Sequence, residues 1–327
     1  MASDMKCPSC GGTLTFDPGW DRLVCGFCGY KKQIPELVSK IVVPEEDFDA
    51  ANKLASRDWK MEKQIVHCNS CGAETVNSKL QFSGTCPFCG SSNILPIDDR
   101  NEILAPNGII PFKIREKRAQ FIFKEWLGNR SLAPEKLSKE ADLSEFRGLY
   151  IPYFTFDCET KSIYSGKYGS DATHCWTVEN KEFDKFVDDF PVVASKKLTE
   201  DRLLMSVANY RTRDARPYTP SALAGFPAEH YSITLGEAWN IAMNEMMSYL
   251  RLEAYRLENA RIQSNVNLTS SYRNLKYKYL LVPMWVNSFE YDGKRYMIVI
   301  NGQTGEIAGQ WPRSFDTLVK RALEIFF

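Results

Sequence analysis

The chain has 327 residues, of which 44% are hydrophobic and 25% charged, and its 41 basic and 41 acidic side chains give a formal net charge of zero. These values are typical of a globular chain of two or three domains, without a global attraction to nucleic acid or anionic lipid. No run of about 18 apolar residues predicts a membrane-spanning helix, and the first residues lack a signal-peptide pattern. We therefore expect a cytoplasmic, reducing location for its ten cysteines.

Eight of the cysteines form a repeat near the N-terminus. A CxxC pair at 7–10 is followed after fourteen residues by a second pair at 25–28, and the arrangement recurs with an offset of 61 residues. A glycine follows each pair and supplies turn conformations that other residues avoid, and two such pairs in a hairpin place four thiolates around one Zn²⁺. We predict two Cys₄ zinc ribbons, each with one structural Zn²⁺, and the following ligands: Cys7, Cys10, Cys25 and Cys28 in the first, Cys68, Cys71, Cys86 and Cys89 in the second.

The spacing of the cysteines leaves two other readings open. An iron–sulfur or rubredoxin-like iron site uses similar ligands, and a single CxxC near a βαβ pattern is typical of redox proteins. A catalytic zinc needs an open coordination position, which four thiolates do not leave. Structural zinc is favoured, because each ribbon is too small to form its own core and needs the metal for its folding free energy.

The charge of the ribbon region bears on the kind of partner. The first hundred residues carry 11 basic and 13 acidic side chains, and two filled tetrathiolate sites bring this region to about −6. Such a module is poorly matched to a phosphate backbone. Nucleic-acid binding stays open as the alternative, because folding could gather Lys31, Lys32 and Lys79 with the rings of Phe27 and Phe88 on one face.

Beyond the first ribbon, apolar residues at helical spacing predict a helix over 44–66. Further helices are predicted over 115–127 and 131–140. Aromatic and β-branched residues over 148–167 predict strands. The rest of the chain is therefore expected to mix helices and strands.

The longest predicted helix covers 234–262. Thr234 and Glu237 match a capping box at its start. Its apolar side chains recur at helical spacing and are expected to face the core: Trp239, Met243, Met246, Leu250, Ala254 and Leu257.

The C-terminal part predicts an antiparallel meander. Strands over 277–291 and 294–300 are joined by Asp292-Gly293, which suits a two-residue hairpin turn, and a third strand covers 306–311. The class is therefore α+β, with an antiparallel sheet and a long amphipathic helix in the body. The predicted division of the chain is as follows: first zinc ribbon 1–34, helical linker 35–66, second zinc ribbon 67–97, α+β body 98–314, amphipathic C-terminal helix 315–327.

Few residues suggest catalysis. His174 adjoins Cys175, and Cys158 precedes them in the same region. A Cys–His nucleophile needs contact between the side chains and an orienting third group, which adjacency in the sequence does not supply. A hydrolase is thus the weakest reading, no enzyme is expected, and the roles of these three residues stay undecided.

Beyond the paired ribbons, five short segments follow in a fixed order: 150–157, 164–166, 223–226, 281–285 and 301–305. Together with the ribbons, they are spread over nearly the whole chain. This set resembles a bacterial family of TFIIB-type double zinc-ribbon proteins, some of which carry a primosomal-helicase label. No GxxxxGK[ST] phosphate loop occurs in the chain to support a helicase.

Members of this family are often encoded beside SPFH, or flotillin-like, membrane-scaffold proteins, and the resemblance implies no established reaction. It implies a non-enzymatic zinc-binding adaptor or scaffold that docks a protein partner, an SPFH-type assembly, by peripheral association at the inner face of the membrane. The alternative is a nucleic-acid-binding zinc-ribbon protein of transcription or replication.

Overall fold

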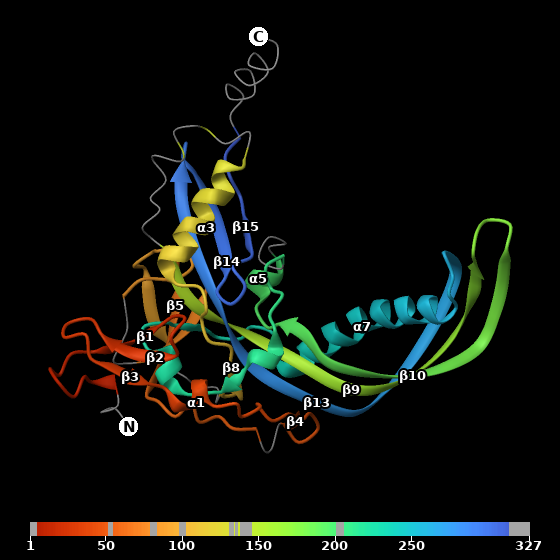
Figure 1. Ribbon diagram of the computed structural model, residues 1–327, viewed down its shortest axis with the longest axis horizontal. Helices are drawn as coiled ribbons and strands as arrows, with labels where there is room; N and C mark the ends of the chain where they lie inside the picture. Colours follow the sequence, from red (N-terminus) through yellow and green to blue (C-terminus); the bar gives the residue numbers. More distant parts are fainter. Residues whose placement is uncertain are drawn as a thin grey trace, which may run out of the picture.

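Figure 1 shows the computed structural model of the chain, which describes residues 5–51, 55–78, 84–97, 103–130, 134, 137, 146–200 and 206–313. Among these residues, a three-stranded sheet has the order β1-β2-β3, and a twelve-stranded sheet forms the centre of the molecule. Most strand pairs are antiparallel, and the helices are few. The predicted α+β class is confirmed.

The small sheet belongs to the first ribbon. Its strands are β1 (Leu14–Asp17), β2 (Arg22–Cys25) and β3 (Lys31–Gln33), all antiparallel. Leu14 and Phe16 alternate with exposed or half-buried neighbours and point into the core, as the period of two in a strand requires. The short helix α1 (Pro35–Val38) follows.

The strands of the second ribbon belong to the large sheet. These are β5 (Lys63–Cys68), β6 (Glu74–Ser78) and β7 (Ile94–Ile97), with β5 between the other two. A short strand of the body, β12 (Ala228–Glu229), pairs with β6 on one side and with β9 on the other. The predicted boundary at residues 66 and 67 therefore lies inside β5, and a continuous sheet joins the second ribbon to the body.

The prediction of one helix over 44–66 is wrong for most of its described residues, of which only Ala51 is helical. The segment contains β4 (Glu46–Asp47), which pairs with a strand of the body, and residues 55–62 form neither helix nor strand before β5 begins. Trp59 is 2% exposed, and its ring packs edge-on against that of Tyr218 at 5.9 Å between centroids. Tertiary burial of the apolar side chains has overridden their helical spacing.

Three long strands dominate the body: β9 (Arg147–Gly169), β10 (Cys175–Val193) and β13 (Ile262–Tyr291). Both outer strands pair antiparallel with β9. In Figure 1 these strands run out from the body as a curved projection. We call this projection the arm and define it by the following ranges: 158–169 of β9, 175–187 of β10 and 262–273 of β13.

The long helix α7 (Leu235–Leu257) packs along the arm (Figure 1). Its predicted capping box is present, since the Thr234 N–H donates to Glu237 Oε2 at 2.7 Å and the Glu237 N–H donates to Thr234 Oγ1 at 3.3 Å. The buried stripe repeats every four residues: Ala238, Ala242, Met246, Leu250 and Ala254.

Not all the predicted core side chains of α7 are buried. Trp239 and Met243 are half-buried beside the stripe. Leu257 is 52% exposed, so its predicted core position is wrong. The helical period places Leu257 on the same side of the helix as Met246 and Leu250, but the buried stripe ends at Ala254, and Leu257 lies beyond it in the last turn.

The predicted C-terminal meander is confirmed. β13 continues through a two-residue turn into β14 (Lys294–Asn301), and β15 (Ile307–Gly309) pairs with β14. Asp292 and Gly293 have φ values of 51° and 68°, the left-handed conformation that a primed hairpin turn demands. The predicted helix over 115–127 is α3 (Glu116–Gly128), which buries Phe123 against Phe289.

The remaining elements are short: β8 (Gly108–Ile109), α5 (Lys196–Glu200), η2 (Thr212–Asp214), β11 (Arg216–Pro217) and η3 (Pro220–Leu223). No helix in the described part of the chain combines the length and apolar character that crossing a membrane requires. The helix predicted over 315–327 lies outside the described residues, as does nearly all of the one predicted over 131–140.

Candidate metal centres

The structure gathers the four thiols of the first ribbon. Their sulfur atoms all lie within 4.8 Å of one another, with Cys7 Sγ 3.4 Å from Cys28 Sγ and Cys10 Sγ 3.5 Å from Cys25 Sγ. A tetrahedral zinc with Zn–S bonds of about 2.3 Å places its sulfurs about 3.8 Å apart. This arrangement can hold one zinc ion.

The second ribbon repeats the arrangement. Cys68 Sγ lies 3.6 Å from Cys89 Sγ, and Cys71 Sγ lies 3.6 Å from Cys86 Sγ, again with all four sulfurs within 4.8 Å. The structure thus brings each predicted ligand set together, and each set can hold one zinc ion with no open coordination position.

The four CxxC turns share one backbone conformation. The glycines after the pairs, Gly11, Gly29, Gly72 and Gly90, have φ values from 73° to 75°. Each donates its N–H to the carbonyl of the first cysteine of its pair, over 2.7–3.0 Å. A Cβ atom disfavours this conformation, which explains why a glycine occupies the position in all four turns.

Neighbouring groups favour the thiolate form at part of each site. Hydrogen bonds from the backbone N–H groups of Cys28 and Phe27 lower the pKa of Cys25 to about 6. The Cys86 thiol and, with a smaller effect, the Lys197 ammonium lower the pKa of Cys71 to about 4. Zinc binds the deprotonated thiol, and hydrogen bonds within each group raise the pKa of a partner thiol, Cys10 in the first ribbon and Cys86 in the second.

The first ribbon exposes its ligand end. Cys10 and Cys28 are exposed, and the Phe27 side chain between the ligands is 84% exposed. The opposite end of the hairpin docks on the body, where the Phe16 N–H donates to Ala224 O at 2.8 Å and Arg115 Nε donates to Pro18 O at 2.8 Å.

The second ribbon buries the corresponding end. Phe88, which lies 61 positions after Phe27, is 1% exposed. Lys197 of α5 lies over its ring at 4.9 Å and donates to Cys71 O at 3.0 Å. Arg147 of β9 donates from Nε to Pro87 O at 3.1 Å. Lys197 and Arg147 were not anticipated, because nothing near them in the sequence links them to a cysteine motif.

Titratable groups also lie behind the second ribbon. His67 Nδ1 is 3.3 Å from Glu74 Oε1, and His230 Nδ1 is 3.5 Å from Glu74 Oε2. Glu229 of β12 is buried and accepts a hydrogen bond from Ser195 Oγ at 2.6 Å. Burial raises the pKa of Glu229 to about 8. This carboxyl, at the junction of ribbon and body, has no signal in the sequence.

The structure separates Cys158 from the other two residues considered for catalysis, His174 and Cys175. Cys158 is buried against Met246 at 4.0 Å between sulfurs, and burial raises its pKa to about 11. His174 and Cys175 are exposed at the far end of the arm, where Cys175 pairs with Gly169. That pair lies eleven residues along β9 from Cys158, or about 35 Å. Cys158 is therefore too far from His174 to pair with it, and His174 Nδ1 and Cys175 Sγ both hydrogen-bond to Asp171, at 2.9 Å and 3.5 Å.

The two aromatic side chains of the set considered for nucleic acid differ in burial. Phe27 is exposed, but Phe88 is buried under Lys197. Lys79 lies outside the described residues. The two phenylalanines therefore do not offer a shared stacking surface.

Comparison with known proteins finds a full-length relative. The chain is 28% identical over 329 residues to the uncharacterized protein YdjG of Bacillus subtilis (strain 168), and the match covers 96% of this chain and 91% of the relative. No family model matches the chain, and no solved structure matches it significantly. The similarity thus extends over nearly the whole chain.

Proposed function

We propose that the chain is a non-enzymatic zinc-binding adaptor that holds two structural Zn²⁺ ions and docks a protein partner. The two Cys₄ groups support the zinc, since each can hold one ion with its coordination complete. Zinc in such a site stabilises a fold and leaves no position for a substrate or an activated water.

The exposed ligand end of the first ribbon carries the proposal. Phe27 is 84% exposed at the tip of a turn that a bound Zn²⁺ would hold rigid, and a large rigid aromatic side chain is a common anchor in protein interfaces. The body holds the other end of the same ribbon. The first ribbon is therefore the docking module, and the second ribbon joins it to the body as part of the scaffold.

For the partner, we propose an SPFH-type membrane-scaffold protein, which places the chain in the cytoplasm at the inner face of the membrane. Support comes from the resemblance to TFIIB-type double zinc-ribbon proteins, which are often encoded beside such scaffolds. Membrane association would then be peripheral and would run through the partner.

The test compares three tagged forms purified from native cells: wild type, Phe27→Ala and Val42→Ala. Val42 is 81% exposed and lies outside the ribbon, so its variant is the matched control. We expect the wild type and Val42→Ala to retain the SPFH-type protein and Phe27→Ala to lose it. Equal recovery with all three forms would contradict docking through the first ribbon.

Nucleic-acid binding is the competing outcome. Fluorescence anisotropy with single-stranded and duplex DNA and RNA, at about 50 mM and 200 mM salt, detects phosphate contacts by their steep salt dependence. We expect no binding at micromolar protein. Micromolar affinity that falls steeply with salt would replace the adaptor by a nucleic-acid-binding protein.

A further inference from the structure

The arm has two open strand edges. Its centre is β9, and β10 and β13 flank it on either side. Among the described residues, β10 pairs with β9 alone, and β13 has no second strand partner before Lys276, where β4 begins. An open edge presents unpaired N–H and C=O groups that can template another strand.

Bulges interrupt the pairing of both outer strands with β9 and leave one regular stretch in each, which we call its window. The register shifts define the β10 window as residues 181–187 and the β13 window as residues 267–273. Both windows contain seven residues, and they pair with overlapping parts of β9, residues 158–164 for β10 and 159–165 for β13. The two edges therefore offer pairing surfaces of equal length at the same level of the arm.

The two windows differ in charge. Four of the seven residues of the β10 window are charged: Lys181, Glu182, Asp184 and Lys185. The β13 window reads NLTSSYR, with Arg273 as its one charged side chain. Charged side chains protect an exposed strand edge from pairing. The β10 edge has this protection, and the β13 edge over the same span nearly lacks it.

We propose that the β13 window is a homodimer interface, in which it pairs antiparallel with the β13 window of a second copy. With the windows superposed, Ser270 lies on the twofold axis and Thr269 lies opposite Ser271 of the second copy. No like charges face each other, and hydroxyl pairs of this kind stabilise antiparallel strands. The twofold contact is closed, which is the commonest form of oligomer.

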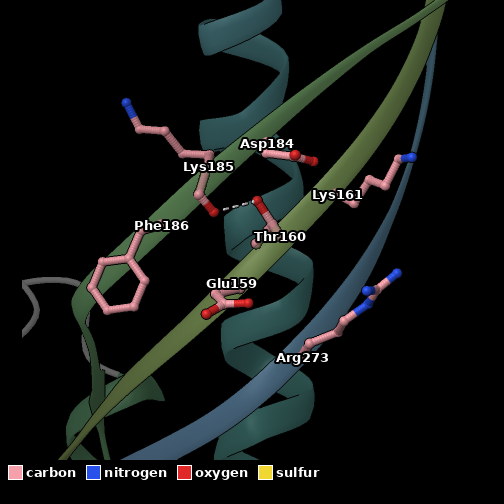
Figure 2. Close-up of a pocket in the computed structure, with 7 residues that line it drawn as sticks. All are labelled: Glu159, Thr160, Lys161, Asp184, Lys185, Phe186 and Arg273. Carbon is pink, nitrogen blue, oxygen red and sulfur yellow. Dashed lines mark hydrogen bonds between the residues drawn. The ribbon is translucent and has the colours of Figure 1, made fainter.

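The β10 edge does not offer the same pairing. Superposing its window on that of a second copy places Asp184 opposite Asp184 of that copy, and like charges directly opposite are destabilising. Within one chain, register pairs place Asp184 beside Lys161 and Arg273 beside Glu159. Figure 2 looks onto this face of the three strands, with α7 behind it and Asp184 and Arg273 on opposite outer strands.

The contact ends where β4 begins. β4 occupies the edge of β13 from Lys276, so intermolecular pairing stops at the bulge after Arg273. The antiparallel arrangement directs the two bodies to opposite ends of a six-stranded sheet. Pairing between the two copies is thus confined to their β13 windows.

The test is sedimentation velocity of the zinc-loaded full chain over about 1–100 µM, a range in which mass action shifts a monomer–dimer equilibrium. We expect a dimer whose population rises with concentration. The double variant Thr269→Lys/Ser271→Lys places four ammonium groups around the axis and is expected to raise the dimer Kd at least about tenfold. Both substituted side chains are exposed, so the fold should tolerate them.

Two further measurements separate repulsion at the interface from misfolding. An equimolar mixture of Thr269→Lys/Ser271→Lys with Thr269→Glu/Ser271→Glu should recover a heterodimer, since opposite charges then face each other. Phe186→Lys, on the other edge of the arm, should dimerise like the wild type. A wild type that is monomeric throughout the range, or a dimer that the charge variants leave unchanged, would overturn the proposal.

Discussion

The two zinc ribbons repeat one motif but occupy opposite structural settings. The first forms a separate three-stranded sheet and exposes Phe27, whereas the second contributes its strands to the large sheet and buries Phe88 under Lys197. The same turns and the same thiol geometry serve both. A repeated metal motif thus preserves the site and leaves its role in the fold free to diverge.

The cause of the difference is long-range pairing. β12 joins β6 of the second ribbon to β9 of the body, and side chains from β9 and α5 hold the ligand turns. The first ribbon contacts the body through the opposite end of its hairpin. The stability of the whole fold should therefore depend on the second ribbon, whereas the first ribbon should be the one that partners can reach.

The largest expected effect comes from matched ligand substitutions. Cys86→Ser removes the zinc of the second ribbon and should lower the free energy of unfolding of the whole chain by more than about 4 kcal/mol, a size typical of losing a structural metal. Cys25→Ser, at the equivalent position, should remove one zinc and leave the second set filled. Metal analysis and thermal unfolding measure both results.

The wild type should contain two zinc ions per chain in that analysis. Loss of both ions from Cys25→Ser would mean that the ribbons share ligands, contrary to the two separate thiol groups. Iron as the main metal would favour a rubredoxin-like site instead.

Truncating the two equivalent phenylalanines sharpens the comparison. Phe88→Ala should destabilise the chain by about 3–4 kcal/mol, because it empties a buried site. Phe27→Ala should change stability by less than about 0.5 kcal/mol, as expected for an exposed side chain. Denaturant unfolding followed by circular dichroism gives both values, and equal losses would show that the ribbons are equally embedded.

The junction of the second ribbon with the body should respond to pH through Glu229. Its folded pKa of about 8 lies above its ordinary value of 4.5, so the folded chain binds the proton more tightly and the free energy of unfolding falls as pH rises towards 8. Between about pH 6 and pH 8 this group should remove about 2 kcal/mol. Glu229→Gln should abolish that part of the slope in unfolding measurements at several pH values, and an unchanged slope would assign it to other groups.

The smallest effect concerns Lys197, which has no counterpart at the first ribbon among the described contacts. Lys197→Met keeps the length of the side chain but removes its hydrogen bond to Cys71 O and its charge over Phe88. We expect a loss of about 1 kcal/mol and faster zinc release from the second site to a chelator. Unchanged stability and release would mean that the ammonium contributes nothing to this ribbon.

Local patterns predicted the local structure well. The capping box at Thr234 and the Asp292-Gly293 turn occur where expected, because each depends on residues only a few positions apart. The helix over 44–66 failed because burial of Trp59 and the pairing of β4 outweigh helical spacing. The prediction that Leu257 faces the core failed because periodicity does not show where a helix loses contact with the rest of the core.

What the sequence by itself determined is the make-up of the two candidate metal sites: the cysteines, their grouping in fours and the glycines that shape each turn. These features are local, since a CxxC turn closes within a few residues. Only the tertiary structure decided that Phe27 is exposed and Phe88 buried, and that no other described strand covers the outer edges of β10 and β13 on the arm. The physical reason is that burial and strand pairing depend on contacts between residues that can be more than a hundred positions apart. Two copies of the same local motif do not specify those distant contacts.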